Sequence, residues 1–451
     1  LADCAEPAKP GRRGGQFDLA LNGSTTPGRI ALAARGNYAG RAITMPRRAV
    51  LLRQDDGGWA LAETQLGFGQ GFVIASGRFG GNQPMAAQLA LADLPLDLAG
   101  ALAGDLDVGG TASGEVAISS GPNGLLTGSA RVLIAGLTRS STLLSSRPLD
   151  LALVADLSET LLQTRAVLRD DGGARGRVQA RIGNLPRGGT LAERLYAGDL
   201  AAGLRWFGPA DVLWRLAAVE LIDLDGDLVI AANATGTLAE PLVRGSLSGD
   251  GLRLRSALTG IDITGLAARG VFSGSRLNLT SLAGNAPGGG RLSGSGFLDF
   301  SGMAPGRGPQ MDLRIAARDA RILDLPNMGA TVTGPLRIVS QGNGGTIAGR
   351  LRTSNARWRL GTSEALASLP VVAIREINRP ADAAPVLADA SPWRYLIDAD
   401  AGGEGIAVDG MGLDSRWAGT VRLRGTTADP RLGGEVRIVP RQGFYSFAGT
   451  R

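Results

Sequence analysis

The sequence predicts an all-β protein: a long curled, mainly antiparallel β-sheet with an open hydrophobic groove and a few short helices. Three observations favour this fold. Apolar residues recur at every second position in many short segments, which is the spacing of a strand with one buried and one solvent-exposed face. Glycine is frequent, at 69 of 451 residues, and aromatic residues make up only 4%. A compact globule of this length uses more large aromatic side chains in its core.

A repeated turn is the third observation. Residues 419–439, GTVRLRGTTADPRLGGEVRIV, contain two alternating strands that place Arg422 and Arg437 opposite an apolar face. The turn between the strands has the pattern G-T-x3-P-x3-G at residues 425–434, and the same spacing occurs at residues 236–245. An internal repeat of this kind indicates an architecture built from similar hairpins.

The chain divides into three parts by composition. Residues 1–15 are rich in Pro, Gly and Arg and are predicted to be linker-like. Residues 16–229 form an upstream β-groove segment, in which strand signals recur at the spacing of an all-β array. Residues 230–451 form the last part, with an Ala/Asp/Pro linker near residues 381–392.

Short helices are expected in the upstream segment near residues 95–102 and 209–218. Pro209 suits the first position of a helix, and the residues after it place apolar side chains on one face. Trp206 and Trp214 make this the most aromatic stretch of the chain. We interpret it as a local helix packed on the sheet rather than a ligand site, because aromatic residues at helical spacing usually belong to a core.

The composition excludes most catalytic sites. The chain has no histidine, one cysteine (Cys4) and one lysine (Lys9), so it has no Ser/His/Asp triad, no cysteine metal cluster and no phosphate-binding P-loop. Residues 223–227 resemble the start of a calcium loop, but their glycine is misplaced, which favours a charged turn. We therefore predict no enzyme, no catalytic residue, no metal and no cofactor, although sequence alone leaves carboxylate catalysis open.

The charge pattern argues against a nucleic-acid partner. The net charge is +6, and nearly all of the basic residues are arginines spread over alternating strand positions. A nucleic-acid interface has clustered basic residues, often interleaved with aromatic ones. The alternating arginines instead indicate a solvated face of the sheet.

The apolar face is the candidate functional feature. A very long sheet cannot leave this face bare in water, and curling into a gutter would create a groove for hydrocarbon chains. Burial of each CH₂ group contributes about 0.8 kcal/mol, so the many CH₂ groups of an acyl chain together would hold a lipid in the groove. The residues expected to line the groove and contact lipid are Leu252, Leu254, Ile261, Ile263, Leu277, Leu279, Leu298, Phe300, Ile406, Val408, Val421, Leu423, Val436 and Ile438.

Residues 230–451 resemble the C-terminal region of the TamB family, the inner-membrane component of the translocation and assembly module. The segments 233–300, 330–380 and 405–449 carry the resemblance, and the last reads GIAVDGMGLDSRWAGTVRLRGTTADPRLGGEVRIVPRQGFYSFAG. Residues 1–229 are similar in style only. The chain has no run of about 18 apolar residues and no signal peptide, and both of its ends are expected to be cuts through a longer protein.

The resemblance implies a β-taco fold in a periplasmic bridge of a Gram-negative bacterium. Such proteins are anchored to the inner membrane by a helix that this chain lacks, and they meet a TamA-like outer-membrane barrel through their C-terminus. The family, with its AsmA-like relatives, is linked to phospholipid transport, to outer-membrane biogenesis and to autotransporter assembly in protein secretion.

Three functions follow as hypotheses. The first is a conduit for phospholipid along the groove. The second is an assembly scaffold or chaperone for autotransporters and other outer-membrane protein clients, working with the TamA-like barrel. The third is a closed β-helix adhesin. The sequence lacks the aromatic stacking ladders and the fixed coil length that such a fold would have, which argues against this hypothesis.

Overall fold

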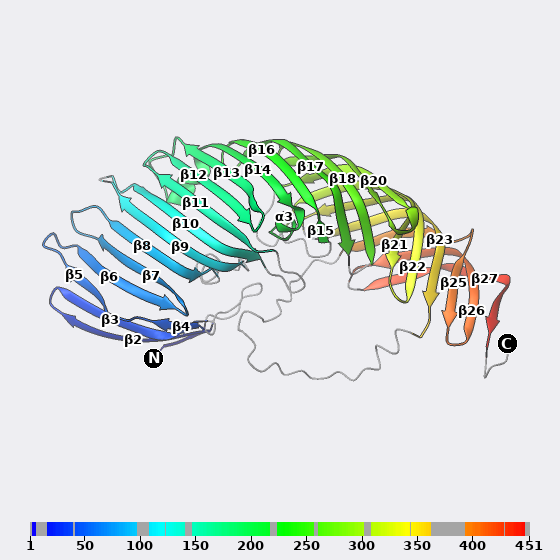
Figure 1. Cartoon of the computed structure of the whole chain (residues 1–451), viewed down its shortest axis with the longest axis horizontal. Helices are drawn as coiled ribbons and strands as arrows, with labels where there is room; N and C mark the ends of the chain where they lie inside the picture. Colours follow the sequence, from blue (N-terminus) through cyan, green and yellow to red (C-terminus); the bar gives the residue numbers. More distant parts are fainter. Residues whose placement is uncertain are drawn as a thin grey trace.

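The computed structural model describes residues 2–5, 16–38, 41–96, 108–121, 123–139, 147–216, 223–256, 260–301, 308–342, 344–361, 393–427 and 429–446. These residues form one 27-stranded sheet and two α-helices. The sheet is curled along its length, with its strands running across the long axis and the two ends of the chain at opposite ends (Figure 1). The predicted all-β curled sheet is therefore confirmed.

The 27 strands are numbered in chain order. The first nine are β1 (Ala2–Ala5), β2 (Gln16–Thr26), β3 (Arg29–Tyr38), β4 (Arg41–Thr44), β5 (Ala49–Arg53), β6 (Trp59–Phe68), β7 (Gly71–Phe79), β8 (Ala86–Pro95) and β9 (Val108–Ser120). The next nine are β10 (Leu126–Arg139), β11 (Leu149–Leu157), β12 (Leu162–Asp170), β13 (Gly173–Gly183), β14 (Asp199–Pro209), β15 (Asp223–Asp225), β16 (Asp227–Gly236), β17 (Pro241–Ser256) and β18 (Ile261–Gly274). The last nine are β19 (Arg276–Asn285), β20 (Arg291–Asp299), β21 (Gln310–Asp324), β22 (Met328–Gln341), β23 (Gly345–Arg359), β24 (Arg394–Asp400), β25 (Ile406–Gly410), β26 (Leu413–Gly425) and β27 (Pro430–Tyr445).

Helices are short and few in the described residues. They are α2 (Leu191–Ala197), α3 (Ala210–Leu216) and the 3-10 turn η1 (Pro287–Gly289). Helix α3 lies where a helix near residues 209–218 was predicted, although Pro209 is the last residue of β14 rather than the first of the helix. Residues 217 and 218 lie outside the described residues.

The other expected segments are described only in part. Residues 2–5 of the predicted linker form strand β1, which pairs with β2. Pro95 ends strand β8, and residues 97–102 of the expected upstream helix lie outside the described residues, as does the linker predicted at residues 381–392. Strand β16 runs through the boundary proposed at residue 230 and pairs with both β14 and β17.

Most neighbouring strands are consecutive in sequence and antiparallel, as hairpin connections require. At three places in the sheet, two short strands lie end to end and pair with the same neighbour. Strands β4 and β5 both pair with β3, β15 and β16 both pair with β17, and β24 and β25 both pair with β23. Strand β23 pairs in parallel with β24 and β25. Parallel strands need a longer connection than a hairpin turn. In the sequence, residues 362–392 lie between β23 and β24.

The two copies of the repeated turn have the same geometry. Gly236 lies opposite Pro241 across one hairpin, and Gly425 lies opposite Pro430 across the other. In the second hairpin the Thr426 hydroxyl accepts a hydrogen bond of 3.1 Å from the Asp429 N–H, and the first has the matching Thr/Glu contact at 3.0 Å. Each proline begins a strand, where a missing N–H is tolerated. The sequence repeat is therefore a structural repeat.

Candidate functional site: the concave apolar face

One face of the sheet carries a continuous row of apolar residues. Residues that lie opposite one another on paired strands point to the same face, so a row can be followed from strand to strand. One such row runs without a break from β8 to β24. It consists of Leu94, Ala112, Ile134, Leu151, Leu168, Gly176, Trp206, Ile230, Leu247, Gly270, Leu279, Gly296, Leu313, Ile338, Ile347 and Tyr395.

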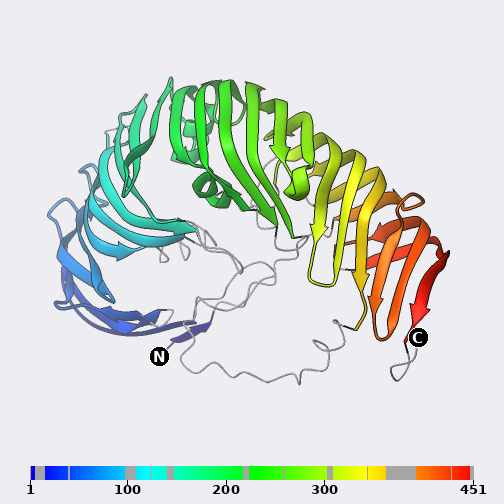
Figure 2. The ribbon, with the colours of Figure 1, turned by 45° about the vertical axis from the view of Figure 1, so that its right-hand side comes forward.

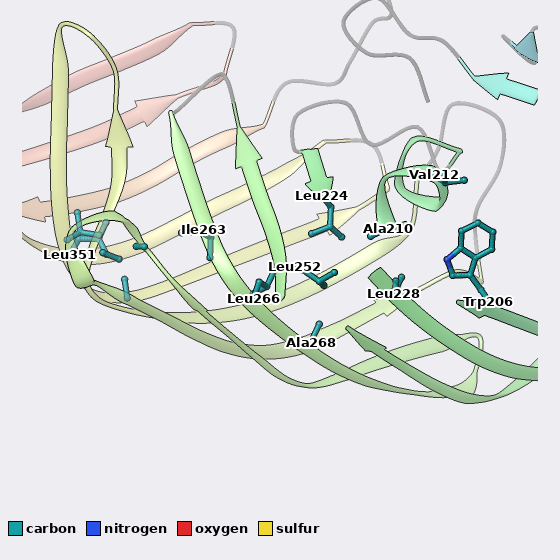
Figure 3. Packing of buried hydrophobic residues seen from close by; sticks show 14 of the residues in the cluster. Trp206, Ala210, Val212, Leu224, Leu228, Leu252, Ile263, Leu266, Ala268 and Leu351 are labelled. Carbon is teal, nitrogen blue, oxygen red and sulfur yellow. The ribbon is translucent and has the colours of Figure 1, made fainter. Parts of the chain in front are cut away.

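The sheet forms an arch (Figure 2), and the buried apolar side chains lie on its concave side (Figure 3). Many of these buried side chains form one large cluster and point into the concave side (Figure 3), and Ile182 and Leu200 belong to a second, smaller cluster. Leu252 is among the most buried, with 1% of its surface exposed. The buried members are Leu149, Trp206, Ala210, Val212, Leu224, Leu228, Leu252, Ile263, Leu266, Ala268, Ala286, Ala317, Ala320, Val332 and Leu351.

The predicted groove residues that lie in strands occupy this face, and they are buried to different extents. The register places them opposite other apolar residues, as with Leu254 and Ile263 or Leu423 and Ile397. The buried ones are Leu252, Ile263, Leu277 and Val408. The half-buried ones are Leu254, Ile261, Leu279, Leu298, Ile406, Val421 and Leu423. The exposed ones are Phe300, which follows the end of β20, and Val436 and Ile438 of β27, which pairs only with β26 among the described residues.

Helix α3 covers part of the concave face. Ala210 and Val212 of the helix are almost fully buried beside Trp206, which lies in strand β14 (Figure 3). The Ala210 N–H donates a 2.7 Å hydrogen bond to the Gly226 carbonyl. The predicted packing of a local helix on the sheet is thus confirmed, while Trp206 itself belongs to the sheet.

A charged contact holds this helix in place. The Asp211 carboxylate is buried at the start of α3 and forms a 3.0 Å ion pair with the Arg147 guanidinium, which lies before β11. A buried carboxylate is stable only when it is paired, so this contact fixes the position of α3 over the sheet.

Comparison with known proteins identifies the C-terminal part of the chain. The family model of the TamB C-terminal domain matches residues 280–451. This part of the chain is similar to the TamB C-terminal domain. No curated protein and no solved structure matches the chain. The TamB domain extends from β19 to the end of the described sheet, and it therefore contains the last third of the apolar row.

The outer face of the TamB domain and of the preceding strands carries the charges. Arginine and aspartate side chains pair across neighbouring strands, as expected for a solvated face. Arg253 pairs with Asp262 at 2.6 Å and Arg337 with Asp312 at 2.7 Å. The calcium-like segment is part of this pattern, because Asp223 forms a 2.9 Å ion pair with Arg255. The predicted charged turn is confined to a bend at Gly226, because residues 223–225 form β15 and Asp227 begins β16.

These ion pairs lower the pKa of their carboxylates. A side-chain hydrogen bond from Arg253 lowers the pKa of Asp262 below its ordinary value, and hydrogen bonds from Arg337 and Arg424 lower the pKa of Asp312 and Asp398 in the same way. Burial raises the pKa of the Tyr395 phenol, which lies at the end of the apolar row. The two faces of the sheet therefore differ in polarity as well as in composition.

The lowered pKa values predict a loss of stability in acid. A carboxylate whose pKa is lower in the folded state than its ordinary value of 3.8 stabilises the fold above that value. This contribution is lost as the pH falls from about 5 towards the folded-state pKa. We expect the melting temperature, followed by circular dichroism, to be steady from neutral pH to about 5 and to fall below about 4. Asp312→Asn should make the fall shallower, and an unchanged melting temperature in acid would contradict this account.

Helix α2 was not among the predicted helices. It begins after Thr190, whose hydroxyl accepts a hydrogen bond from the Glu193 N–H while the Glu193 carboxylate accepts one from the Thr190 N–H. This capping box is visible in the sequence as Thr-x-x-Glu and could have located the helix. Arg194 of α2 is buried and donates a 2.6 Å hydrogen bond to the Pro186 carbonyl.

Two further properties concern the described residues alone. They contain no helix that is long and apolar enough to cross a membrane. They also contain no cluster of three or more potential metal ligands.

Proposed function

We propose that this chain carries phospholipid along its concave apolar face, as part of a non-enzymatic bridge across the periplasm. The TamB family functions in the translocation and assembly module and in outer-membrane biogenesis, as a bridge in the cell envelope that works with TamA. Inner-membrane anchoring, phospholipid as the cargo and a TamA-like barrel as the partner of this chain are parts of the proposal.

The uninterrupted apolar row from β8 to β24 carries the proposal. At this level of the concave face an acyl chain would meet only apolar side chains, glycine and the Tyr395 ring, except at β14, where helix α3 covers Trp206. Each CH₂ group transferred from water contributes about 0.8 kcal/mol. The binding free energy of an acyl chain would therefore be similar at successive strands, and no single strand would hold it much more tightly than its neighbours. The headgroup would stay at the open side, because burying a charge without a partner is costly.

Partial burial of the candidate residues supports the same function. Leu254, Leu279, Val421 and Leu423 are half-buried rather than closed into a core, so their side chains still present apolar surface. A sheet face that served stability alone would be covered more completely. We therefore place the lipid path over these half-buried positions, with the fully buried Leu252 and Ile263 forming its floor.

Photo-crosslinking tests this path. A photoreactive amino acid at Val421 or Leu423 should crosslink phospholipid in cells, and the crosslinked lipid can be identified by mass spectrometry. Arg422 lies between these two residues in β26 and is exposed, so it provides a matched control for the outer face. Arg437 on β27 provides a second control, with an exposed side chain.

The expected result is strong lipid labelling at the apolar positions and little at the arginines. Equal labelling of both sets would contradict a path confined to the concave face. Mass spectrometry of lipids that co-purify with the unlabelled chain gives an independent readout, and phospholipid should be enriched relative to a protein of similar size without an apolar face.

The free edge of β27 favours an assembly scaffold as the second candidate function. Among the described strands, β27 pairs only with β26, and its Leu432, Val436 and Ile438 are exposed. An exposed edge can accept a further strand from an outer-membrane protein client or an autotransporter. In that case crosslinkers in β27 would capture polypeptide rather than lipid. A closed β-helix adhesin is inconsistent with the antiparallel neighbours, because β-helix coils stack in parallel.

A further inference from the structure

The outer face of the TamB domain contains a trough that the lipid path does not use. It has a volume of about 1010 Å³ and crosses β19 to β24 and β26. Its floor is made of small side chains that lie opposite one another on neighbouring strands, as Ser293, Ala316 and Pro335 do. These residues alternate with the apolar row, so the trough lies on the charged side of the sheet.

Four arginines line the trough, and two of them are already paired. Arg337 donates hydrogen bonds of 2.9 and 2.7 Å to the two carboxylate oxygens of Asp312. Arg424 donates one of 2.6 Å to Asp398. The other two, Arg314 and Arg350, are exposed and have no ion pair within the described ranges.

The arrangement concentrates positive charge. Arg314 lies directly opposite Arg337, and the Asp312 carboxylate is the counter-charge near both guanidinium groups. Arg350 lies opposite Asp398, whose carboxylate is hydrogen-bonded to Arg424. Four guanidinium groups against the carboxylates of Asp312 and Asp398 leave an excess of two positive charges at the trough.

We propose that this trough binds an extended acidic polypeptide segment of a partner protein. Seven strands at about 4.8 Å spacing give a trough about 29 Å long, which matches about nine residues of an extended chain. The small floor residues leave room for a peptide backbone, and the arginine fork can bind carboxylates in a bidentate manner.

Other anionic partners fit the trough less well. A flat membrane surface cannot reach the floor of a concavity, and the trough lacks aromatic side chains on which nucleic-acid bases could stack. An acyl chain would leave most of its surface in water, because the trough is open and bordered by charges. An extended acidic chain is the occupant that uses both the length and the charge.

Fluorescence anisotropy with the full chain tests this proposal. The probe is a fluorescein-labelled peptide of about nine alternating Glu and Ala residues, and the matched neutral probe has Gln in place of Glu. The acidic peptide should bind, and its affinity should fall as salt is raised. The double variant Arg314→Ser/Arg350→Ser should weaken binding about tenfold, the combined effect of two exposed charge pairs.

A control variant separates the trough from general charge. Arg291 and Arg318 lie opposite each other on the same outer face but outside the trough, and both are exposed. Arg291→Ser/Arg318→Ser removes the same charge and should change the affinity less than about twofold. An equal loss in both double variants, or equal binding of the Gln peptide, would overturn the proposal. So would binding of phosphatidylglycerol vesicles, but not of the acidic peptide, through Arg314 and Arg350.

Discussion

Leu252→Ala is expected to lower the free energy of unfolding by about 2–5 kcal/mol, the usual cost of a large-to-small change in a closed core. Leu252 is 1% exposed and lies opposite Leu266 on the concave face. Its side chain fills the space above two glycines: an added Cβ would lie 2.7 Å from it at Gly249 and 3.1 Å from it at Gly226. The surrounding backbone therefore has little freedom to collapse into the cavity, which favours the upper part of the range.

Urea denaturation followed by circular dichroism measures this effect. A long sheet of neighbour contacts can unfold in parts, so hydrogen exchange in β17 and β18 should accompany the global measurement. Leu396→Ala is the matched control, because the same side chain is removed from the outer face, where it is 52% exposed. We expect a change within about 0.5 kcal/mol there. Similar losses in both variants would show that the concave face is not the core of the sheet.

Gly434→Ala is expected to detach part of strand β27 from the sheet. Gly434 has a φ of 119°, a backbone conformation that costs other residues about 1–3 kcal/mol. An added Cβ would lie 2.1 Å from the Thr420 carbonyl oxygen of β26, closer than any allowed contact. The edge strand has one neighbour among the described strands, so it can relieve this clash by moving away rather than by unfolding the whole sheet.

Hydrogen exchange of the β26–β27 hairpin measures the detachment. Amide protection should fall by about tenfold or more around Gly434, while strands far from the edge keep theirs. Gly433→Ala is the control within the same strand, because nothing lies within 4 Å of its added Cβ. If both substitutions left protection unchanged, the close approach of Gly434 to β26 would not constrain this hairpin.

The hairpin repeat and the two faces of the sheet could be predicted because their signals are local. Val421 and Leu423 alternate with Arg422, and the spacing from Gly425 to Gly434 sets the turn and the close approach together. Period-two alternation decides which side chains share a face even when the strand partners are unknown. The assignment of Trp206 to a helix was wrong because helical and strand spacing are both consistent with a short apolar run.

Other features depend on partners that are distant in sequence. Strand β23 pairs in parallel with β24, a contact that no alternation pattern encodes. The burial of Asp211 follows from an ion pair with Arg147, which lies in another part of the chain. The trough requires that Arg314 on β21 and Arg350 on β23 fall at neighbouring levels of the sheet, and this depends on the register of three strands. The sequence alone indicates which side chains of a strand share a face, but it does not give the register between neighbouring strands.

The order of the strands allows the length of this protein to change in steps. Nearly every strand pairs with the strands before and after it in the sequence, so a hairpin could be gained or lost without rethreading the chain. An added or lost hairpin of two strands would change the length of the sheet by about 10 Å. Because a hairpin returns the chain to its original direction, the strands that follow would keep their direction and their residues would stay on the same side of the sheet. We expect insertions and deletions among related proteins to occur as whole hairpins, which would adapt the reach of the sheet to the distance that it must cover.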